Sequence, residues 1–344
     1  MKFKKSVLLA LLLSTQLVQA EIANTDSVNG FIHKMVSQHR FNEMQLRQLF
    51  KTVEIQQPIL DAMSKPAEAK PWFQYRDIFM TEARIAGGVQ FWQENQAALA
   101  AVERQYGVPA EIIIAIIGVE TKYGANTGKY RVIDALSTLG FAYPKRSEFF
   151  LKELEQFLLL TRDEQLDPLS LNGSYAGAMG FPQFMPSSFR TYAADFDHDQ
   201  HRDIWKNSAD AIASVANYFV RNQWQAGGEI AFPVTAKGEA YQKALSKGVK
   251  PDSTVGQLRA LQINVPKQLA NNQAAKLLSY QTLDGHELWI GLHNFYVITR
   301  YNHSPLYAMA VYQLSQAIAE RKPANSQLIA NQWQTNTTLP RLKY

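Results

Sequence analysis

The stretch EIIIAIIGVETKYGANTG, residues 111–128, combines an unbroken apolar run with one acidic side chain at its end. Residues 112–119 carry no charge, and Glu120 follows them directly. A helix that is apolar on every side is a buried helix. Glu120 would share one face of that helix with Ile116 and Ile117. The pattern therefore predicts a carboxyl group at the end of a buried helix.

A carboxyl group in this position has two interpretations. Desolvation disfavours its charged form and raises its pKa, which is the arrangement that a general acid needs. Alternatively, the group is a buried glutamate neutralised by a neighbouring arginine or lysine, because structural ion pairs also perturb carboxyl groups. The pattern by itself leaves both interpretations open.

The first twenty residues have the pattern of an export signal. Three lysines at positions 2, 4 and 5 precede the apolar residues 7–13, and the small-residue site Val18-Gln19-Ala20 follows. The apolar part is too short to span a bilayer as a helix. We therefore expect residues 1–20 to be a signal peptide and the mature protein to be soluble and periplasmic, in a bacterium.

Cysteine content and net charge exclude some covalent modifications and disfavour one class of partner. The sequence has no cysteine, which excludes disulfides and a lipid attached to a cysteine at the cleavage site. The formal net charge is +5, and the expected leader holds three lysines and no acid, so the remainder carries +2. Without a dense run of lysine and arginine, a nucleic-acid partner is disfavoured.

Helical patterns with short β-prone runs predict a mainly α (α+β) protein. A long helical segment is expected at 81–106, turn formers dominate 171–189, and the runs 227–236 and 277–292 are β-prone. The expected segments are an N-terminal helical region (21–107), the first part of a core (108–226), a small α/β insert (227–290), a closing helix of the core (291–321) and a polar tail (322–344).

Three motifs carry a resemblance to a known family. They are GVETKYGANTGKYRVIDALSTLGFAYPKRSEFF (118–150), GSYAGAMGFPQFMPSSF (173–189) and HNFYVITRYNHSPLYAMAV (293–311). In these motifs and their order, the chain resembles the lytic murein transglycosylase B family, whose members cleave peptidoglycan on a lysozyme-like fold. The resemblance extends from Tyr75 to about Ile318, and the lack of cysteine resembles the soluble members.

The resemblance implies a lytic transglycosylase that uses Glu120 as its one catalytic acid and needs no cofactor. Glu120 would protonate the β-1,4 bridge between N-acetylmuramic acid and N-acetylglucosamine. It would then deprotonate the muramic acid 6-hydroxyl, which attacks C1 and leaves a 1,6-anhydro end. Ordinary glycosidases need a second carboxylate. The nearest acids in the sequence have the pattern of solvated helix faces: Asp134, Glu148, Glu153, Glu155, Asp163 and Glu164.

The resemblance also implies substrate-binding positions. Polar residues of the glycine-rich loop would bind the acid or the acetamido group, aromatic and amide residues would line the groove, and two basic residues would lie near the peptide stem. In that order the residues are Ser174 and Gln183; Tyr75, Tyr218, Tyr301, Asn302 and Tyr307; Lys145 and Arg146. The structural alternative for a single tyrosine is core packing.

The segment DFDHDQHRDIWK, residues 195–206, has acids at positions 1, 3, 5 and 9 of an EF-hand-like loop. Similar family members bind calcium at this place. However, Gln200 stands where a sharp turn favours glycine, and Lys206 stands where a bidentate acid would close the site. The alternative is a polar loop held by Arg202 and Lys206. The candidate ligands for a structural calcium ion are Asp195, Asp197, Asp199, Asp203 and Asp210.

Three functions are weighed: a lytic transglycosylase, a hydrolytic muramidase of the same fold, and a peptidoglycan-binding protein without turnover. The presence of Glu120, Ser174 and Gln183 favours the first. The expected partners are the glycan strands and peptide stems of peptidoglycan, and a cell-wall synthase or amidase is a candidate protein partner. We expect a monomer.

Overall fold

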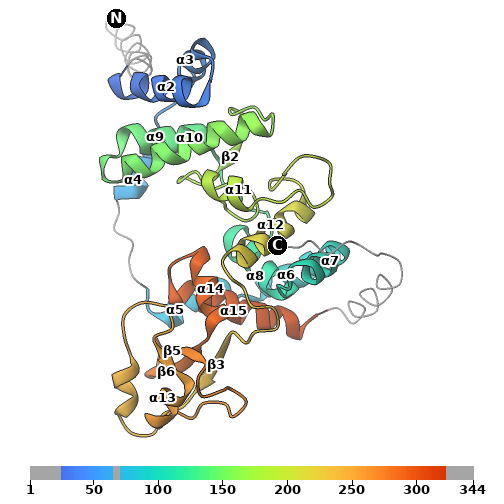
Figure 1. The fold of residues 1–344 in the computed structure, drawn as a ribbon, viewed down its shortest axis with the longest axis vertical. Coiled ribbons are helices and arrows are strands. Elements are labelled where there is room, and N and C mark those ends of the chain that lie inside the picture. The colour runs from blue at the N-terminus through green and yellow to red at the C-terminus, as the bar shows by residue number, and fades with distance from the viewer. Residues whose placement is uncertain (1–24, 65–69, 323–344) are drawn as a thin grey trace, which may run out of the picture. The chain divides into compact units, whose positions relative to one another are not determined.

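The computed structural model describes residues 25–64 and 70–322, which contain fourteen α-helices and six short β-strands. The described residues form two compact units by their contacts. The first unit contains residues 25–64 and 127–191, and the second contains 70–126 and 192–322. A mainly helical protein with small sheets was predicted, and Figure 1 shows it.

The contacts group the chain differently from the predicted segments. They divide the predicted core segment 108–226 between the two units, whereas the predicted insert 227–290 lies in the second unit. The predicted segment boundaries remain a prediction. The predicted signal peptide and residues 323–344 of the predicted tail lie outside the described residues.

The first unit is built on two helices that pack against each other, α9 and α10. Edge-to-face contacts between Phe31, Phe50 and Phe141, with ring centroids 5.8–6.1 Å apart, attach the N-terminal helices to α9. The elements are α2 (Asp26–His39), α3 (Glu43–Phe50), α4 (Gln57–Ser64), β1 (Tyr130–Arg131), α9 (Val132–Ala142), a 3-10 turn (Pro144–Arg146), α10 (Ser147–Asp163), β2 (Asn172–Gly173) and α11 (Pro186–Tyr192).

The acids of the first unit correct one expectation from the sequence. Asp134, Glu153, Glu155 and Glu164 were expected on solvated helix faces, but all four are buried. Asp134 accepts hydrogen bonds from Arg131 and from the backbone N–H of Glu54, and Glu153 accepts two from Ser187. Glu155 pairs with Lys34 and His39. These partners make it possible to bury the carboxylates. Hydrophobic periodicity alone does not reveal such partners. Glu148 and Asp163 are exposed, as expected.

The second unit surrounds the helix that the opening sequence predicted. Helix α8 packs against α6, α7, α12 and α15, and its residues 112–118 are all buried. The helices of this unit are α5 (Trp72–Phe79), α6 (Glu82–Glu94), α7 (Gln96–Tyr106), α8 (Ala110–Thr121), α12 (Ser208–Arg221), α13 (Val255–Ala260), α14 (His293–Tyr301) and α15 (Pro305–Glu320), with a 3-10 turn at Ala240–Ala244.

The long helical segment expected at 81–106 is two helices, because Asn95 interrupts it. The Asn95 side chain donates to the carbonyl of Phe91 and accepts from the Ser208 hydroxyl at 2.5 Å. A short amide side chain that bonds locally competes with the helical backbone, which explains the break.

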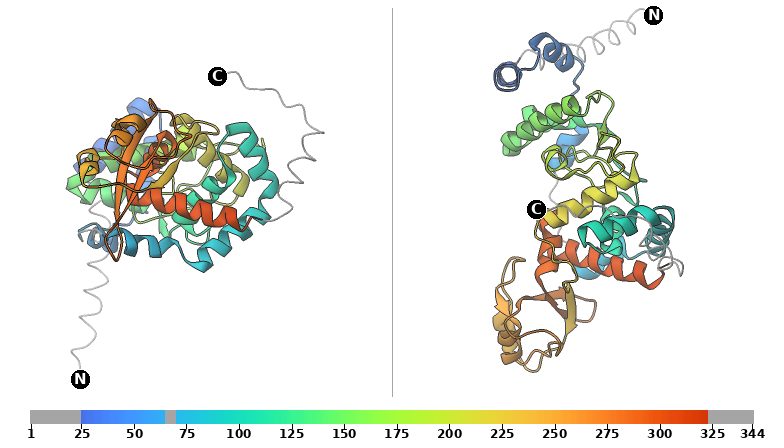
Figure 2. Two further views of the ribbon diagram at one scale, coloured as in Figure 1. Left: turned by 90° about the horizontal axis from the view of Figure 1, so that it is seen from below. Right: turned by 45° about the vertical axis from the view of Figure 1, so that its right-hand side comes forward.

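The β-prone runs contain β3, β6 and most of β5, which together with β4 form one antiparallel sheet in the order β3-β6-β5-β4. Figure 1 labels β3, β5 and β6, and Figure 2 shows the ribbon from two further directions. The strands are β3 (Ala231–Val234), β4 (Ser253–Thr254), β5 (Ala274–Gln281) and β6 (His286–Gly291). One face of the sheet covers a small apolar core that includes Val255, Leu258 and Leu277. None of the described helices has the length and apolarity to cross a membrane.

Candidate active site

Glu120 lies in the last turn of α8, directly before the tight turn that ends the helix. Lys122 and Tyr123 both have left-handed backbone conformations, with φ of 52° and 62°. Their N–H groups bond to the carbonyls of Gly118 and Ile117, which ends the helix in the manner of a Schellman motif. Two successive side-chain-bearing residues in this region are strained, so surrounding contacts must hold the turn.

Tyr123 supplies those contacts. Its hydroxyl donates to the carbonyl of Arg84 at 2.7 Å, and the Arg84 guanidinium donates to the carbonyl of Gly118. A Cβ atom added at Gly118 would lie 2.6 Å from the Tyr123 hydroxyl oxygen, and one at Gly87 would lie 2.9 Å from the ring. The ring therefore fits because glycines on α6 and α8 leave space for it. The sequence analysis did not identify Tyr123.

The Glu120 carboxyl group is held by one neutral hydrogen bond and by burial. The Tyr307 hydroxyl donates to Glu120 Oε1 at 2.6 Å. Burial raises the pKa of Glu120 from 4.5 to about 7, although the hydrogen bond from Tyr307 acts in the opposite direction. Neither cause is a basic side chain. The geometry therefore favours the titratable acid over the neutralised structural glutamate, and both protonation states are accessible near neutral pH.

Tyrosines from four other helices lie beside this carboxyl group or beside one another. The rings of Tyr301 and Tyr307 are stacked with centroids 6.5 Å apart, and Tyr218 lies 4.7 Å from Tyr301. The Tyr218 hydroxyl donates to the carbonyl of Arg300 at 2.5 Å. Burial and the negative charge of Glu120 raise the pKa of Tyr75, which places this α5 residue near the same carboxyl group. The four predicted tyrosines of the second unit therefore form one group that reaches Glu120.

The sequence analysis missed two features of this aromatic group. It placed Tyr307 only as a groove-lining residue, whereas Tyr307 contacts the acid directly. It also missed Tyr192, whose ring lies 4.7 Å from Tyr218. No periodicity predicts that contact, because Tyr192 ends a short helix after the glycine-rich loop. Asn302 is exposed immediately after α14.

Ser174 and Gln183 shape the glycine-rich loop of the first unit. Ser174 Oγ accepts from the N–H groups of Ala176 and Ala178, and Gln183 Nε2 donates to the carbonyls of Thr127 and Gly180. These bonds use neither the Ser174 hydroxyl hydrogen nor the Gln183 amide oxygen. Their predicted contact with substrate therefore remains a prediction.

Glycine is needed where the backbone at Gly128 lies against the glycine-rich loop at Gly173. At Gly128, φ is 103° and an added Cβ would overlap the backbone of Gly173. Strand β1 pairs with β2 at this crossing.

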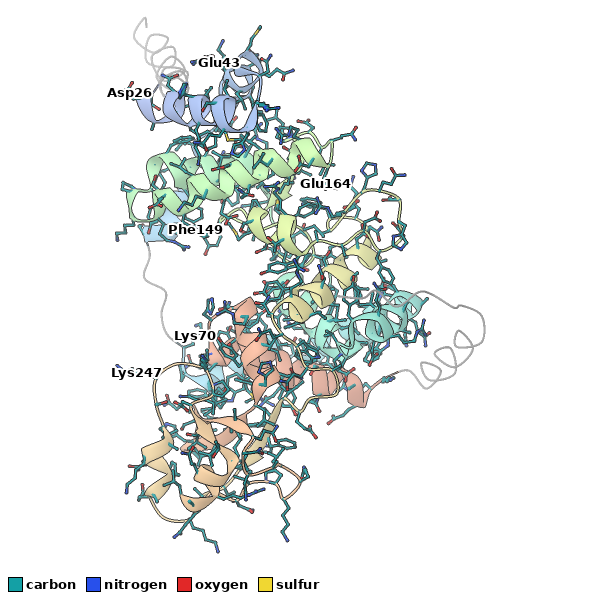
Figure 3. All side chains as sticks on the ribbon, in the orientation of Figure 1. Asp26, Glu43, Lys70, Phe149, Glu164 and Lys247 are labelled. Atoms are coloured by element: carbon teal, nitrogen blue, oxygen red, sulfur yellow. The ribbon has the colours of Figure 1, made fainter. Side chains whose placement is uncertain are left out.

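Lys145 and Arg146 are exposed in the 3-10 turn between α9 and α10. Phe149, labelled in Figure 3, is exposed. The Arg146 guanidinium lies over its ring, 4.5 Å from the centroid. A cation over an aromatic face keeps its charge available at the surface. The positions suit recognition of an anionic group, which remains a prediction.

The acidic loop brings three of its five predicted ligands together. Carboxylate oxygens of Asp195, Asp197 and Asp210 lie within 4.8 Å of one another. Asp210 is fully buried and accepts from the N–H groups of Phe196 and Asp203. Three converging carboxylates are the oxygen-rich set that Ca²⁺ prefers, so these residues fit that ion.

The other two acids of the loop also accept backbone N–H groups, as Asp195, Asp197 and Asp210 do. Asp199 accepts from the N–H of His201, and Asp203 accepts from those of Trp205 and Lys206. Gln200 keeps the sharp turn at the sixth position with φ of 76°, although it is not glycine. The backbone therefore makes the sharp turn at Gln200, although glycine is absent from this position.

The raised pKa of Glu120 predicts a pH-dependent stability. The unfolded chain ionises Glu120 near pH 4.5, whereas the folded chain keeps it protonated to about pH 7. The contribution of protonated Glu120 to the free energy of unfolding is therefore fully present below pH 4.5. It is lost as pH rises through 7, by at most roughly 3 kcal/mol. Glu120→Gln should thus gain stability relative to the wild type between pH 5 and pH 8, measured by urea unfolding. A constant difference across this range would contradict the raised pKa.

Comparison with known proteins places this geometry in a family. Residues 23–316 match the family described as Transglycosylase SLT domain. The membrane-bound lytic murein transglycosylase B of Escherichia coli (strain K12) is 46% identical over 309 residues, which cover 87% of this chain and 84% of that protein.

Solved structures agree. Catenated SltB1 from Pseudomonas aeruginosa is 51% identical with a TM-score of 0.85, covering 88% of this chain and 99% of that chain. Escherichia coli Slt35 in complex with calcium is 44% identical with a TM-score of 0.81, covering 87% and 94%. SltB3 from Pseudomonas aeruginosa, in complex with NAG-anhNAM-pentapeptide, is 28% identical with a TM-score of 0.76, covering 85% and 78%. The predicted lysozyme-like fold is confirmed by these relatives. The chain belongs to the Transglycosylase SLT family and is a peptidoglycan lytic transglycosylase.

Proposed function

We propose that this enzyme cleaves the β-1,4 bond between N-acetylmuramic acid and N-acetylglucosamine with Glu120 as acid and then as base. The observation that carries this proposal is the burial of the Glu120 carboxyl group beside the neutral Tyr307, which raises its pKa to about 7. A group with this pKa can give a proton and take one back at neutral pH, which is the requirement for a single residue in both roles.

The reaction balances with one carboxyl group. Glu120 donates its proton to the bridging oxygen as the bond from C1 to that oxygen breaks, and N-acetylglucosamine leaves as an alcohol. The Glu120 carboxylate then removes the proton of the muramic acid 6-hydroxyl, whose oxygen bonds to C1. The product has a 1,6-anhydro ring, Glu120 is protonated again, and no water is consumed. The bound NAG-anhNAM-pentapeptide of SltB3 is chemically such a product.

The positions of other acids support this route over hydrolysis. A hydrolase needs a second carboxylate to activate water or to form a covalent intermediate. The two causes of the shifted Glu120 pKa include no acid, and the buried acids of the first unit are bound to their own partners. An internal nucleophile in the substrate removes the need for such a residue.

The surrounding side chains have proposed roles in binding. Tyr307 orients Glu120, while Tyr75, Tyr218, Tyr301 and Asn302 offer ring faces and polar edges to sugars. We assign Ser174 and Gln183 to hydrogen bonds with the acetamido group of the substrate, and Lys145 and Arg146 to the peptide stem.

We place the enzyme in the periplasm, free of the membrane after removal of residues 1–20. The leader pattern, the absence of cysteine and the location of peptidoglycan support this placement. A synthase or amidase partner and a monomeric state remain predictions.

We propose that the acidic loop holds one structural calcium ion. The converging carboxylates of Asp195, Asp197 and Asp210 support this, and the related Slt35 was solved with calcium. The ion would neutralise acids that otherwise repel each other and would hold the loop before α12. It has no part in bond cleavage.

The products test the reaction directly. Mass spectrometry of digested sacculi should show 1,6-anhydromuramic acid ends with the wild type, and Glu120→Gln should abolish them because it has no proton to donate. Reducing muramic acid ends would instead establish a hydrolase. Sacculi left intact by the folded wild type would support the binding protein.

The Tyr123 contacts predict that Gly118 is needed to position Glu120. Gly118→Ala places a methyl group against the Tyr123 hydroxyl, so kcat should fall roughly tenfold or more as Glu120 shifts. Gly30→Ala is the matched control, because an added Cβ there meets nothing within 4 Å and α2 is helical. It should leave kcat unchanged and add up to about 1 kcal/mol of stability. Equal kcat for both variants would refute the positioning.

Calcium should raise the melting temperature of the chelator-treated protein, since an ion that binds only the folded chain adds about 2.7 kcal/mol at a concentration of 100 Kd. Asp197→Asn should remove most of this increase. Asp167→Asn is the control, because Asp167 is also exposed and accepts a backbone N–H outside the loop. Identical calcium responses in the wild type and Asp197→Asn would exclude this site.

A further inference from the structure

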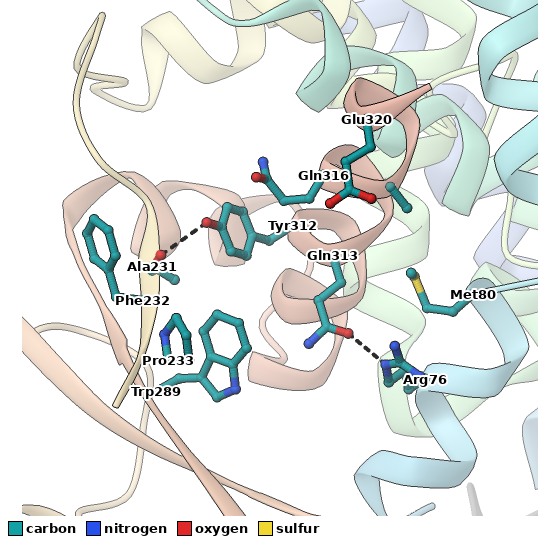
Figure 4. Close-up of a pocket in the computed structure, with 11 residues that line it drawn as sticks. Arg76, Met80, Ala231, Phe232, Pro233, Trp289, Tyr312, Gln313, Gln316 and Glu320 are labelled. Atoms are coloured by element: carbon teal, nitrogen blue, oxygen red, sulfur yellow. Dashed lines mark hydrogen bonds between the residues drawn. The ribbon is translucent and has the colours of Figure 1, made fainter. Parts of the chain in front are cut away.

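An open pocket of about 440 Å³ lies in the second unit, beside the edge strand β3 and strand β6. Figure 4 shows residues that line it: Trp289 comes from β6, and Tyr312 and Gln313 come from α15. Phe232, on β3, also borders the pocket, but its ring packs against the apolar core of the sheet. Arg76, from α5, faces Gln313. Its size is within the range of small-ligand sites.

The pocket is distinct from the Glu120 site, although α15 contributes to both. Tyr307 contacts Glu120 from the first turns of α15. At about 100° per residue, Tyr312, Gln316 and Glu320 lie within about 40° of the direction opposite to Tyr307. The two sites therefore use opposite faces of one helix, and a ligand in the pocket does not need to displace the Glu120 contacts.

The pocket combines aromatic walls with polar groups that can still form hydrogen bonds. The Trp289 ring is half-buried and contributes apolar surface to the pocket, whereas its indole N–H is fully covered by the protein and is not available to a ligand. The Gln313 amide oxygen accepts from Arg76 at 2.7 Å, which leaves its amide N–H groups as donors. The Tyr312 hydroxyl is already used as a donor to the carbonyl of Ala231 at 3.0 Å.

The Gln313 amide N–H groups make the pocket suited to a ligand that brings an acceptor. Gln316 and Glu320 are exposed at the same pocket and add amide and carboxylate acceptors. The ligand must therefore offer both donors and acceptors, together with an apolar face for the aromatic rings. A sugar ring has this combination, because each hydroxyl group both donates and accepts while the axial C–H groups form an apolar face.

The charges argue against an anionic or cationic ligand. Arg76 and Glu320 carry opposite charges, and Arg76 is already bonded to Gln313. A neutral ligand uses both without an unpaired charge.

We infer that this pocket is a second saccharide site, which binds an N-acetylhexosamine residue of the glycan apart from the residue cleaved at Glu120. The choice of glycan rests on the proposed substrate, whereas the site itself rests on the pocket. Such a site holds the enzyme on a long strand between cleavages, so it lowers the KM for polymeric substrate and leaves the chemical step unchanged.

Binding can be observed at Trp289 itself. The full chain with Glu120→Gln is labelled with 5-fluorotryptophan, and Trp289→Phe identifies the Trp289 signal in ¹⁹F NMR. Triacetylchitotriose should shift this signal in a saturable manner. Gln316→Ala combined with Glu320→Gln, both at exposed positions, should weaken the shift at least threefold. Leu283→Ala, on the exposed tip of the β5–β6 hairpin, is the control and should not change it.

Kinetics give the second readout, in the enzyme that retains Glu120. The paired Gln316→Ala and Glu320→Gln variant should raise KM for sacculi at least threefold, while kcat and the cleavage of short soluble muropeptides stay unchanged. The inference would be overturned if triacetylchitotriose did not change the ¹⁹F shift of the Trp289 signal, or if only a free stem peptide changed it. Wild-type enzyme that forms anhydro ends in that case would leave the proposed reaction intact, whereas absence of those ends would refute the reaction separately.

Discussion

The desolvation of one carboxyl group at the end of α8 is the constraint on which the second unit depends. Water would return the Glu120 pKa toward 4.5, and the acid would then be ionised before it met a substrate. A nearby lysine or arginine would do the same. The structure instead provides buried isoleucines and a tyrosine hydroxyl, which removes water without adding a positive charge. This neutral environment makes one residue sufficient for both proton transfers.

The architecture around Glu120 keeps this environment rigid. Helix α8 is enclosed by four helices, so its end cannot move without disturbing the core. The hydrogen bond from the Tyr123 hydroxyl to the Arg84 carbonyl holds the strained turn at Lys122 and Tyr123. Glycines on α6 and α8 leave space for the Tyr123 ring. Tyr307, in turn, is supported by its stacked neighbour Tyr301. Backbone strain is tolerated at functional sites when the surrounding contacts determine it fully, as they do here.

Much of this could be predicted from local patterns. The unbroken apolar run before Glu120 indicated a buried helix, and short β-prone runs indicated the small sheet, because both signals depend only on neighbouring residues. The direct contact between Tyr307 and Glu120 joins residues 187 positions apart, and no local pattern encodes it. The buried ion pairs of Glu155 were missed for the same reason, since a charged residue appears solvated until its distant partners are known. Asn95 shows that one side-chain hydrogen bond can divide a helix that periodicity predicts as continuous.

A direct titration of the acid tests the central claim. Carboxyl ¹³C NMR of the full chain, with Glu120→Gln to identify the signal, gives the pKa of Glu120 without reference to activity or stability. The account predicts a midpoint near 7 and a shift of that signal when Tyr307→Phe removes the donated hydrogen bond. A midpoint near 4.5 would mean that the carboxyl group is solvated, and would contradict the proposed acid.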